Sequence, residues 1–313
     1  MKSQQLAPEK FKHPEVTAKG EERALVALTR LRTLWINTGS LCNLTCRGCY
    51  IESSPTNDRL AYIRLDEVIP YLDEIERDGL PVEEIGFTGG EPFMNPDFPA
   101  IMEACLARGF SVLVLTNAMK PLANKHQALL DLESGYREKM TFRVSIDHYD
   151  RSRHEELRGE GSWEPMLKGV KWLIEHNFRV AVAGRSLWGE PEERVREGYR
   201  SLFAALNIQV SAENSETLVL FPEMDEAQDV PEITVSCWDI LGVKPEAMMC
   251  ATSRMVIRRK EDDGPVVTPC TLLPYDKRFE MGRSLAASSA SVRLNHPHCA
   301  KFCVLGGGSC SAG

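Results

Sequence analysis

The sequence has no long apolar stretch and no excess of basic residues. No run approaches the roughly 20 residues that a membrane-spanning helix needs, and residues 1–20 are polar, without the apolar core of a secretion signal. The 37 Lys and Arg are outnumbered by 45 Asp and Glu, so the net charge is −8. These absences argue against a general nucleic-acid-binding surface and a polybasic membrane contact. We therefore expect a cytoplasmic protein with neither nucleic acid nor membrane as partner.

The length and the cysteine count narrow the protein class further. A chain of 313 residues, 43% hydrophobic and 26% charged, can bury one large α/β domain and carry a small appendage. Ten cysteines are present. Because thiols stay reduced in the cytoplasm, this number favours metal ligation over disulfides.

Three of the cysteines, Cys42, Cys46 and Cys49, share one short loop that follows an apolar, strand-like run. No fourth Cys or His lies in this loop. A structural zinc site needs four protein ligands, whereas an iron–sulfur cubane held by three thiolates keeps one iron open for another ligand. The spacing favours the cluster; the alternatives are incidental thiols or half of a zinc site.

Strand-like and helical segments alternate from residue 33 to about 221. This alternation predicts a parallel sheet with helices outside it, either an incomplete barrel or a doubly wound sheet. The hydrophobic pattern also predicts a helix over residues 21–31, before the first strand. We divide the chain into an N-terminal extension (1–32), an α/β domain (33–224) and a cysteine-rich C-terminal domain (225–313). The predicted strands are 33–37, 84–88, 111–116, 141–146, 178–183 and 217–221, and the predicted helices are 66–78, 99–108, 125–133, 164–176 and 193–206.

Two motifs in this order resemble those of the radical S-adenosylmethionine (SAM) enzymes. The Cx3CxxC triplet follows the first strand, and a strand ending in Gly-Gly-Glu-Pro comes about forty residues later. The resemblance covers residues 33–222 and implies a partial (β/α)6 TIM barrel. It also implies a 4Fe–4S cluster on Cys42, Cys46 and Cys49, whose open iron chelates SAM. The family usually has an aromatic residue before the third cysteine, where this chain has Gly48, so Tyr50 is the nearest candidate for the adenine contact.

Further cofactor contacts are expected at the ends of other strands. Gly89 and Gly90 let the backbone approach a ligand closely and present carbonyls to an ammonium group, and Glu91 can accept from the same group. An ordinary strand-ending turn is the alternative. By resemblance, a polar residue at the end of the fourth strand contacts the ribose, and an Arg after the fifth strand can bind the methionyl carboxylate. The cofactor-binding candidates at the strand ends are Asn117, Ser145, Asp147 and Arg185.

A second cysteine set lies in the C-terminal domain. Its members resemble an auxiliary iron–sulfur cluster domain of the twitch or SPASM-like type, and the number of cysteines suits one auxiliary 4Fe–4S cluster held by four of the five. The spacing predicts a hairpin with a thiol at each base, followed by two thiols on one helical turn. A zinc site that includes His296 or His298 is the alternative. The five cysteines are Cys250, Cys270, Cys299, Cys303 and Cys310.

The resemblance implies an oxidoreductase-like enzyme that cleaves SAM reductively. The resulting 5′-deoxyadenosyl radical would abstract a substrate hydrogen, and the auxiliary cluster would aid oxidation or anchor the substrate. His148 is the candidate proton acceptor, because its unperturbed pKa of about 6.5 is near neutrality. The expected partners are a peptide or small-molecule substrate and a low-potential electron donor such as flavodoxin or ferredoxin. The alternative is a zinc-stabilised α/β binding or maturation-partner protein without radical turnover.

Overall fold

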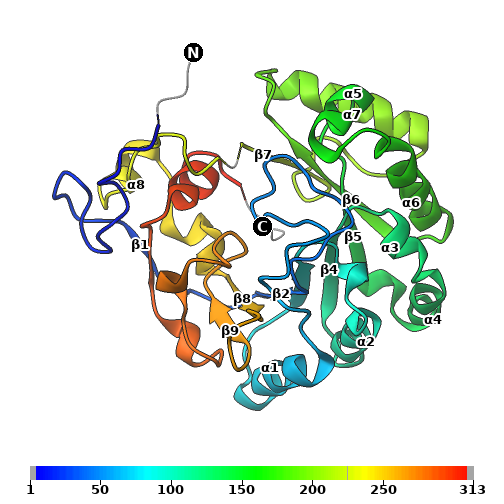
Figure 1. Cartoon of the computed structure of the whole chain (residues 1–313), viewed down its shortest axis with the longest axis horizontal. Coiled ribbons are helices and arrows are strands. Elements are labelled where there is room, and N and C mark those ends of the chain that lie inside the picture. The colour runs from blue at the N-terminus through cyan, green and yellow to red at the C-terminus, as the bar shows by residue number, and fades with distance from the viewer. Residues whose placement is uncertain (1–4, 224, 309–313) are drawn as a thin grey trace.

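Six parallel strands form the centre of the molecule in this computed structural model, which describes residues 5–223 and 225–308 (Figure 1). Next to β2, the first of these six, the sheet continues with β8 (Ser253–Ile257), which is parallel to β2. Strand β9 (Val266–Thr268) then pairs with β8 in antiparallel orientation. The order is β7-β6-β5-β4-β3-β2-β8-β9. The six strands are β2 (Thr33–Asn37), β3 (Glu84–Thr88), β4 (Ser111–Thr116), β5 (Met140–Ser145), β6 (Arg179–Arg185) and β7 (Leu218–Phe221).

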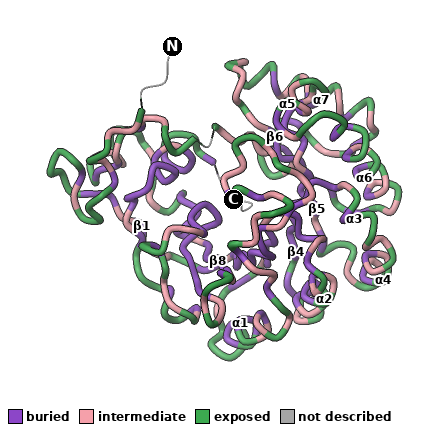
Figure 2. Tube along the Cα trace, viewed as in Figure 1, coloured by how far each residue is buried: buried purple, intermediate pink, exposed green. Residues whose placement is uncertain are grey.

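Helices cover the outer side of the parallel strands (Figure 1). All five residues of β2 are buried, since β3 and β8 pair with its two edges and its faces are covered. Figure 2 shows the same division along the chain, with buried positions along the strands and exposed positions on the outward helix faces. No helix among the described residues has the length and apolarity required to cross a bilayer. The helices are α1 (Leu65–Asp78), α2 (Phe98–Ala107), α3 (Lys120–Ala123), α4 (His126–Tyr136), α5 (Arg151–Arg158), α6 (Trp163–Glu175), α7 (Glu192–Leu206) and α8 (Cys237–Leu241).

The predicted α/β class and mostly parallel sheet are confirmed. The predicted strand limits 84–88 and 111–116 coincide with β3 and β4. Within the described residues the edge strands β7 and β9 do not pair with each other, so the sheet is open, as a partial barrel requires.

One local prediction is wrong, and one helix was not predicted. The helix expected over residues 21–31 is wrong: β1 (Leu25–Val26) lies there and pairs with β10 (Val292–Arg293). Pairing with a distant strand outweighs the local helical pattern because it satisfies the backbone groups and buries Val26. Helix α5 was not predicted, since only His154 and Leu157 on it are buried and they form no apolar stripe.

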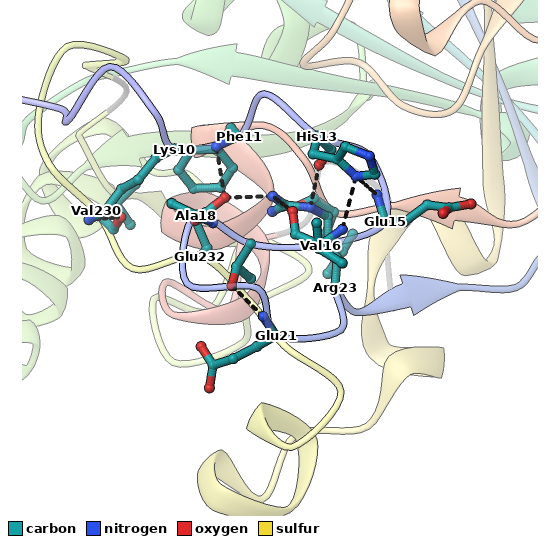
Figure 3. Close-up of polar contacts among 12 residues, drawn as sticks. Lys10, Phe11, His13, Glu15, Val16, Ala18, Glu21, Arg23, Val230 and Glu232 are labelled. Carbon is teal, nitrogen blue, oxygen red and sulfur yellow. Dashed lines mark hydrogen bonds and ion pairs between the residues drawn. The ribbon is translucent and has the colours of Figure 1, made fainter.

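The N-terminal extension packs against the C-terminal segment. Its buried residues Phe11, Ala24 and Val26 belong to the same hydrophobic cluster as the C-terminal cysteines, separate from the core beneath the helices. The carboxylate of Glu232 joins the two segments (Figure 3): it accepts from the backbone N–H groups of Phe11 and Ala18 at 2.7 Å and from buried Arg23 at 2.5 Å. The domain limits at 32 and 225 stay predictions, and β8 shows that the C-terminal segment also extends the central sheet.

Candidate functional site

A cavity lies at the carboxyl ends of the parallel strands, and we call it the central cavity. It has a volume of about 1040 Å³, including the part that opens to solvent. Ten of the residues predicted to bind cofactor or metal line it: Cys42, Cys46, Cys49, Tyr50, Gly89, Gly90, Asn117, Ser145, Asp147 and Arg185.

The loop of three thiols forms one wall of the central cavity. Burial raises the pKa of Cys42 to about 12 and also raises the pKa of Cys46. Both thiols are therefore protonated in the metal-free chain at neutral pH, and metal ligation would release their protons. No three sulfur atoms of the described cysteines lie within 4.8 Å of one another. Three thiols with no fourth Cys or His in the same loop suit an iron–sulfur cluster that keeps one iron open, rather than a closed structural zinc site.

The glycine turn after β3 holds this loop in place. The N–H of Gly90 donates to the carbonyl of Gly39 at 2.8 Å, and the N–H of Glu91 donates to the carbonyl of Leu41 at 3.1 Å. A Cβ atom on Gly90 would lie 2.1 Å from the Leu41 oxygen, and one on Gly89 would lie 2.5 Å from the Gly39 oxygen. The two glycines thus bring the turn against the backbone that leads directly into Cys42.

Glu91 differs from its predicted role as a cofactor contact. It is 1% exposed, and it is absent from the lining of the central cavity. Its carboxylate accepts from the Thr116 hydroxyl and from the Asn117 N–H, both at 2.8 Å, and burial raises its pKa to about 7. The Asn117 amide in turn donates to the side-chain oxygen of Asn43 at 2.9 Å. Glu91 therefore positions the end of β4 and the cysteine loop from beneath.

Three arginines line the central cavity, Arg143, Arg158 and Arg185, and the contacts of the last two bear on ligand binding. Arg158, at the end of α5, donates to the carboxylate of Asp147 at 2.7 and 3.3 Å. Arg185 follows on β6, and its backbone N–H donates to the Asp147 carbonyl at 2.8 Å. The Nε atom of Arg185 is buried and has no hydrogen-bond partner among the described residues. A buried guanidinium nitrogen without a partner suits an anionic group of a ligand in this cavity.

His148 is not among the lining residues of the central cavity, and its role as a proton acceptor stays a prediction. Its Nε2 atom is 2.9 Å from the carboxylate of Glu190 and 3.1 Å from Arg153, while its Nδ1 accepts the N–H of Asp150. Burial lowers the pKa of His148. In the structure the ring joins the loop after β5 to the loop after β6.

The cavity lining also contains residues outside the predicted site set, among them Arg143, Arg158 and Phe302. Arg143 lies two residues before Ser145 on β5, so strand alternation places both on the inner face. That period was visible in the sequence. Arg158 and Phe302 lie on helices whose approach to the cavity depends on the tertiary fold.

Another cavity, of about 1350 Å³ including the part that opens to solvent, adjoins the central cavity, and we call it the outer cavity. The two share Gly48, Cys49, Tyr50 and Arg185 in their linings. The outer cavity also has residues of the loops after β6 and β7, including Trp188 and Glu226. Together the two cavities give an extended path toward the cysteine loop.

Four C-terminal thiols surround a separate, smaller space of about 350 Å³, which we call the cysteine cavity: Cys250, Cys270, Cys299 and Cys303. The predicted hairpin is confirmed by antiparallel β8 and β9, and the predicted helical turn by the π-helix Cys299–Val304. Burial raises the pKa of Cys250 to about 11 and that of Cys299 to about 12. Leu272 lines both the cysteine cavity and the central cavity, so the two are neighbours. Cys310 lies outside the described residues.

Known proteins share this sequence pattern and fold. The family model of the Radical SAM superfamily matches residues 36–199, which is 164 of 313 residues. The antilisterial bacteriocin subtilosin biosynthesis protein AlbA of Bacillus subtilis (strain 168) is 33% identical over 45% of this chain and 30% of its own length. GTP 3′,8-cyclase of Tolumonas auensis is 27% identical over 48% of this chain and 43% of its own. The chain thus spans less than half the length of these curated relatives.

Two solved structures have a similar fold. Streptococcus suis SuiB bound to S-adenosylmethionine aligns with a TM-score of 0.55 and 14% identity, over 81% of this chain and 63% of SuiB. Hexahistidine-tagged anSMEcpe with bound AdoMet aligns with a TM-score of 0.57 and 15% identity, over 82% of this chain and 79% of the other. At this identity the likeness concerns the fold.

Proposed function

Because the chain belongs to the radical SAM superfamily, we propose that it cleaves SAM reductively at a 4Fe–4S cluster ligated by Cys42, Cys46 and Cys49. The observation that carries this proposal is the convergence on one cavity of three thiols, the glycine turn and Arg185, whose Nε atom is buried. The cluster would supply the electron that cleaves SAM into methionine and a 5′-deoxyadenosyl radical. That radical would then abstract a hydrogen atom from the substrate.

The chain's own residues would bind and orient the cofactor. The turn at Gly89 and Gly90 fixes the cysteine loop and would direct a carbonyl toward the SAM ammonium group. Arg185 would pair with the methionyl carboxylate, because its buried Nε lacks a partner in the described part of the chain. Ser145 and Asp147 line the cavity where a ribose could donate hydrogen bonds, and Tyr50 is our candidate for the adenine contact.

We assign an auxiliary iron–sulfur cluster to the cysteine cavity, with Cys250, Cys270, Cys299 and Cys303 as ligands. Two observations support it: the four thiols line one space, and Leu272 lines both this space and the central cavity. Such proximity suits transfer of an electron from the substrate radical to the auxiliary cluster. A low-potential donor such as flavodoxin or ferredoxin would supply the first electron.

For the substrate we propose a peptide. The outer cavity extends the central cavity through four shared residues, so an extended chain could lie in the outer cavity and place one side chain near the SAM site. The relation to a bacteriocin biosynthesis protein agrees with this choice. A nucleotide is the second candidate, on the relation to GTP 3′,8-cyclase.

Anaerobic purification followed by metal analysis tests the proposal. Two 4Fe–4S clusters correspond to about eight irons per chain, with matching sulfide, and reduction in the presence of SAM should yield 5′-deoxyadenosine. Changing Cys42, Cys46 and Cys49 together to Ala should abolish that yield and leave about four irons. A colourless protein with zinc on its cysteines, or cleavage that survives the triple change, would refute the assignment and favour a binding or maturation-partner protein.

A further inference from the structure

A third group of potential metal ligands lies apart from both cysteine sets. Glu226, His296 and His298 place one ligand atom each within 4.8 Å of the others, and this is the only such group among the described residues. Glu226 comes from the segment after β7, while the two histidines precede the π-helix Cys299–Val304. The fold therefore brings together residues that are 70 positions apart in the sequence.

We propose that Glu226, His296 and His298 form a mononuclear site for a divalent transition metal, with zinc as the best match. The Nε2 atoms of both histidines converge on the same carboxylate oxygen of Glu226, at 3.7 Å from His296 and 3.0 Å from His298. A tetrahedral zinc with N and O ligands at about 2.0–2.1 Å separates those ligands by about 3.3 Å. The two observed distances bracket that value.

Hydrogen bonding alone explains only half of this arrangement. His298 is within hydrogen-bond distance of the Glu226 oxygen, but 3.7 Å is too long for a hydrogen bond from His296. Both imidazoles are nonetheless buried, at 7% and 1% exposure, with ring centroids 4.9 Å apart. A metal ion between the three side chains would account for both contacts at once.

The donor set selects the kind of ion. Two imidazole nitrogens and one carboxylate oxygen suit zinc and similar divalent metals, whereas Mg²⁺ and Ca²⁺ prefer oxygen ligands throughout. The N–H of His298 donates to Nδ1 of His296 at 3.1 Å, and ligation through Nε2 would give up this one bond, a small cost beside metal binding.

The place of the site suggests what the metal would do. Three protein ligands leave a tetrahedral zinc one position for water or a substrate group. Glu226 lines the outer cavity, and His298 lines the cysteine cavity. The ion would thus lie between the proposed substrate path and the proposed auxiliary cluster, where it could hold a donor group of a substrate in the outer cavity.

Zinc binding to the full chain, with both cysteine sets loaded with iron and sulfide, tests this site. The Glu226→Gln variant removes a ligand charge from a side chain that is 59% exposed, so the change should not impair folding. Glu223→Gln is the matched control, since Glu223 is 53% exposed and lines the same outer cavity but is not one of the three ligands. His296→Gln is the second variant, with metal counts corrected for folded protein.

The wild type and Glu223→Gln should each retain about one zinc per chain, with only nitrogen and oxygen neighbours in zinc-edge X-ray absorption. Glu226→Gln and His296→Gln should weaken zinc binding by at least about 10–100-fold, the loss known for mere supporting residues, at unchanged iron content. No zinc in the wild type, equal zinc in all variants, or sulfur neighbours around zinc would each overturn the proposal. Unchanged iron and 5′-deoxyadenosine in that case would leave the proposed SAM chemistry standing, so the two failures are distinguishable.

Discussion

Replacing Gly90 by Ala tests whether the glycine turn holds the cysteine loop. The added Cβ would lie 2.1 Å from the carbonyl oxygen of Leu41, and contacts below 3.0 Å are essentially never found for real Cβ atoms. The neighbour is backbone, which cannot rotate away as a side chain can. The turn and the loop must therefore separate by at least about 0.9 Å, within a core packed too densely to absorb the shift.

This separation has a cost for stability and a larger one for activity. Overpacking costs about 1–3 kcal/mol, and the hydrogen bonds from Gly90 to Gly39 and from Glu91 to Leu41 contribute about 1 kcal/mol each. The total of about 3–5 kcal/mol corresponds to a fall in Tm of about 5–8 °C, because 313 residues at about 2.1 cal/mol/K each give an unfolding entropy of about 0.66 kcal/mol/K. Because a misplacement of about 1 Å near reacting groups can cost about 100-fold in rate, 5′-deoxyadenosine formation should fall by about that factor.

Two other glycines supply controls for this experiment. A Cβ on Gly86 would meet the ring of Trp35 at 2.5 Å, so Gly86→Ala should also lower Tm, but it leaves the contact between the turn and the loop intact. Gly135, in α4, has no neighbour within 4 Å of such a Cβ, so its change to Ala should raise stability by about 0.5–1 kcal/mol. Thermal unfolding, iron content and 5′-deoxyadenosine yield are measured for all three. If Gly90→Ala loses no more activity than Gly86→Ala at equal loss of stability, the contact between the glycine turn and the cysteine loop has no special role in activity.

Three further predictions concern the charged residues of the site. Burial raises the pKa of Glu91 from its usual 4.5 to about 7, so the folded state keeps a proton that the unfolded chain releases, and the free energy of unfolding should fall by about 3 kcal/mol between about pH 4.5 and 7. Glu91→Gln should remove that fall in denaturant titrations across this range; an equally steep fall in the variant would contradict the assignment. Arg158→Met leaves the buried carboxylate of Asp147 unpaired and should destabilise by about 3–5 kcal/mol, with partial recovery in a double variant that also carries Asp147→Asn; strictly additive losses would show that the pair is not coupled. Arg185→Leu should weaken SAM binding about 10–150-fold, the equivalent of one charged hydrogen bond of about 1.5–3 kcal/mol, as measured by equilibrium dialysis, whereas unchanged affinity would argue against its pairing with the methionyl carboxylate.

The framework of this protein could be predicted from local patterns in the amino-acid sequence. Strands such as β3 and β4 were predictable because buried parallel strands are short apolar runs bounded by turns, a pattern that local residues carry. The cysteine loop and the Gly-Gly-Glu-Pro turn were visible for the same reason, since each is contiguous in the chain. Parallel strands place their carboxyl ends at one edge, so the sequence also predicted that Asn117, Ser145 and Arg185 would meet.

The tertiary structure alone decided the direction of individual side chains and the contacts between distant segments. Ser145 and Asp147 line the cavity, while the neighbouring His148 is absent from its lining and contacts Glu190 instead. Arg158 reaches Asp147 only because α5 packs over the end of β5. Likewise, Glu226 contacts the two histidines only because the tertiary fold brings together segments that are 70 positions apart in the sequence. Such contacts depend on how whole elements pack, and no local pattern in the sequence records that.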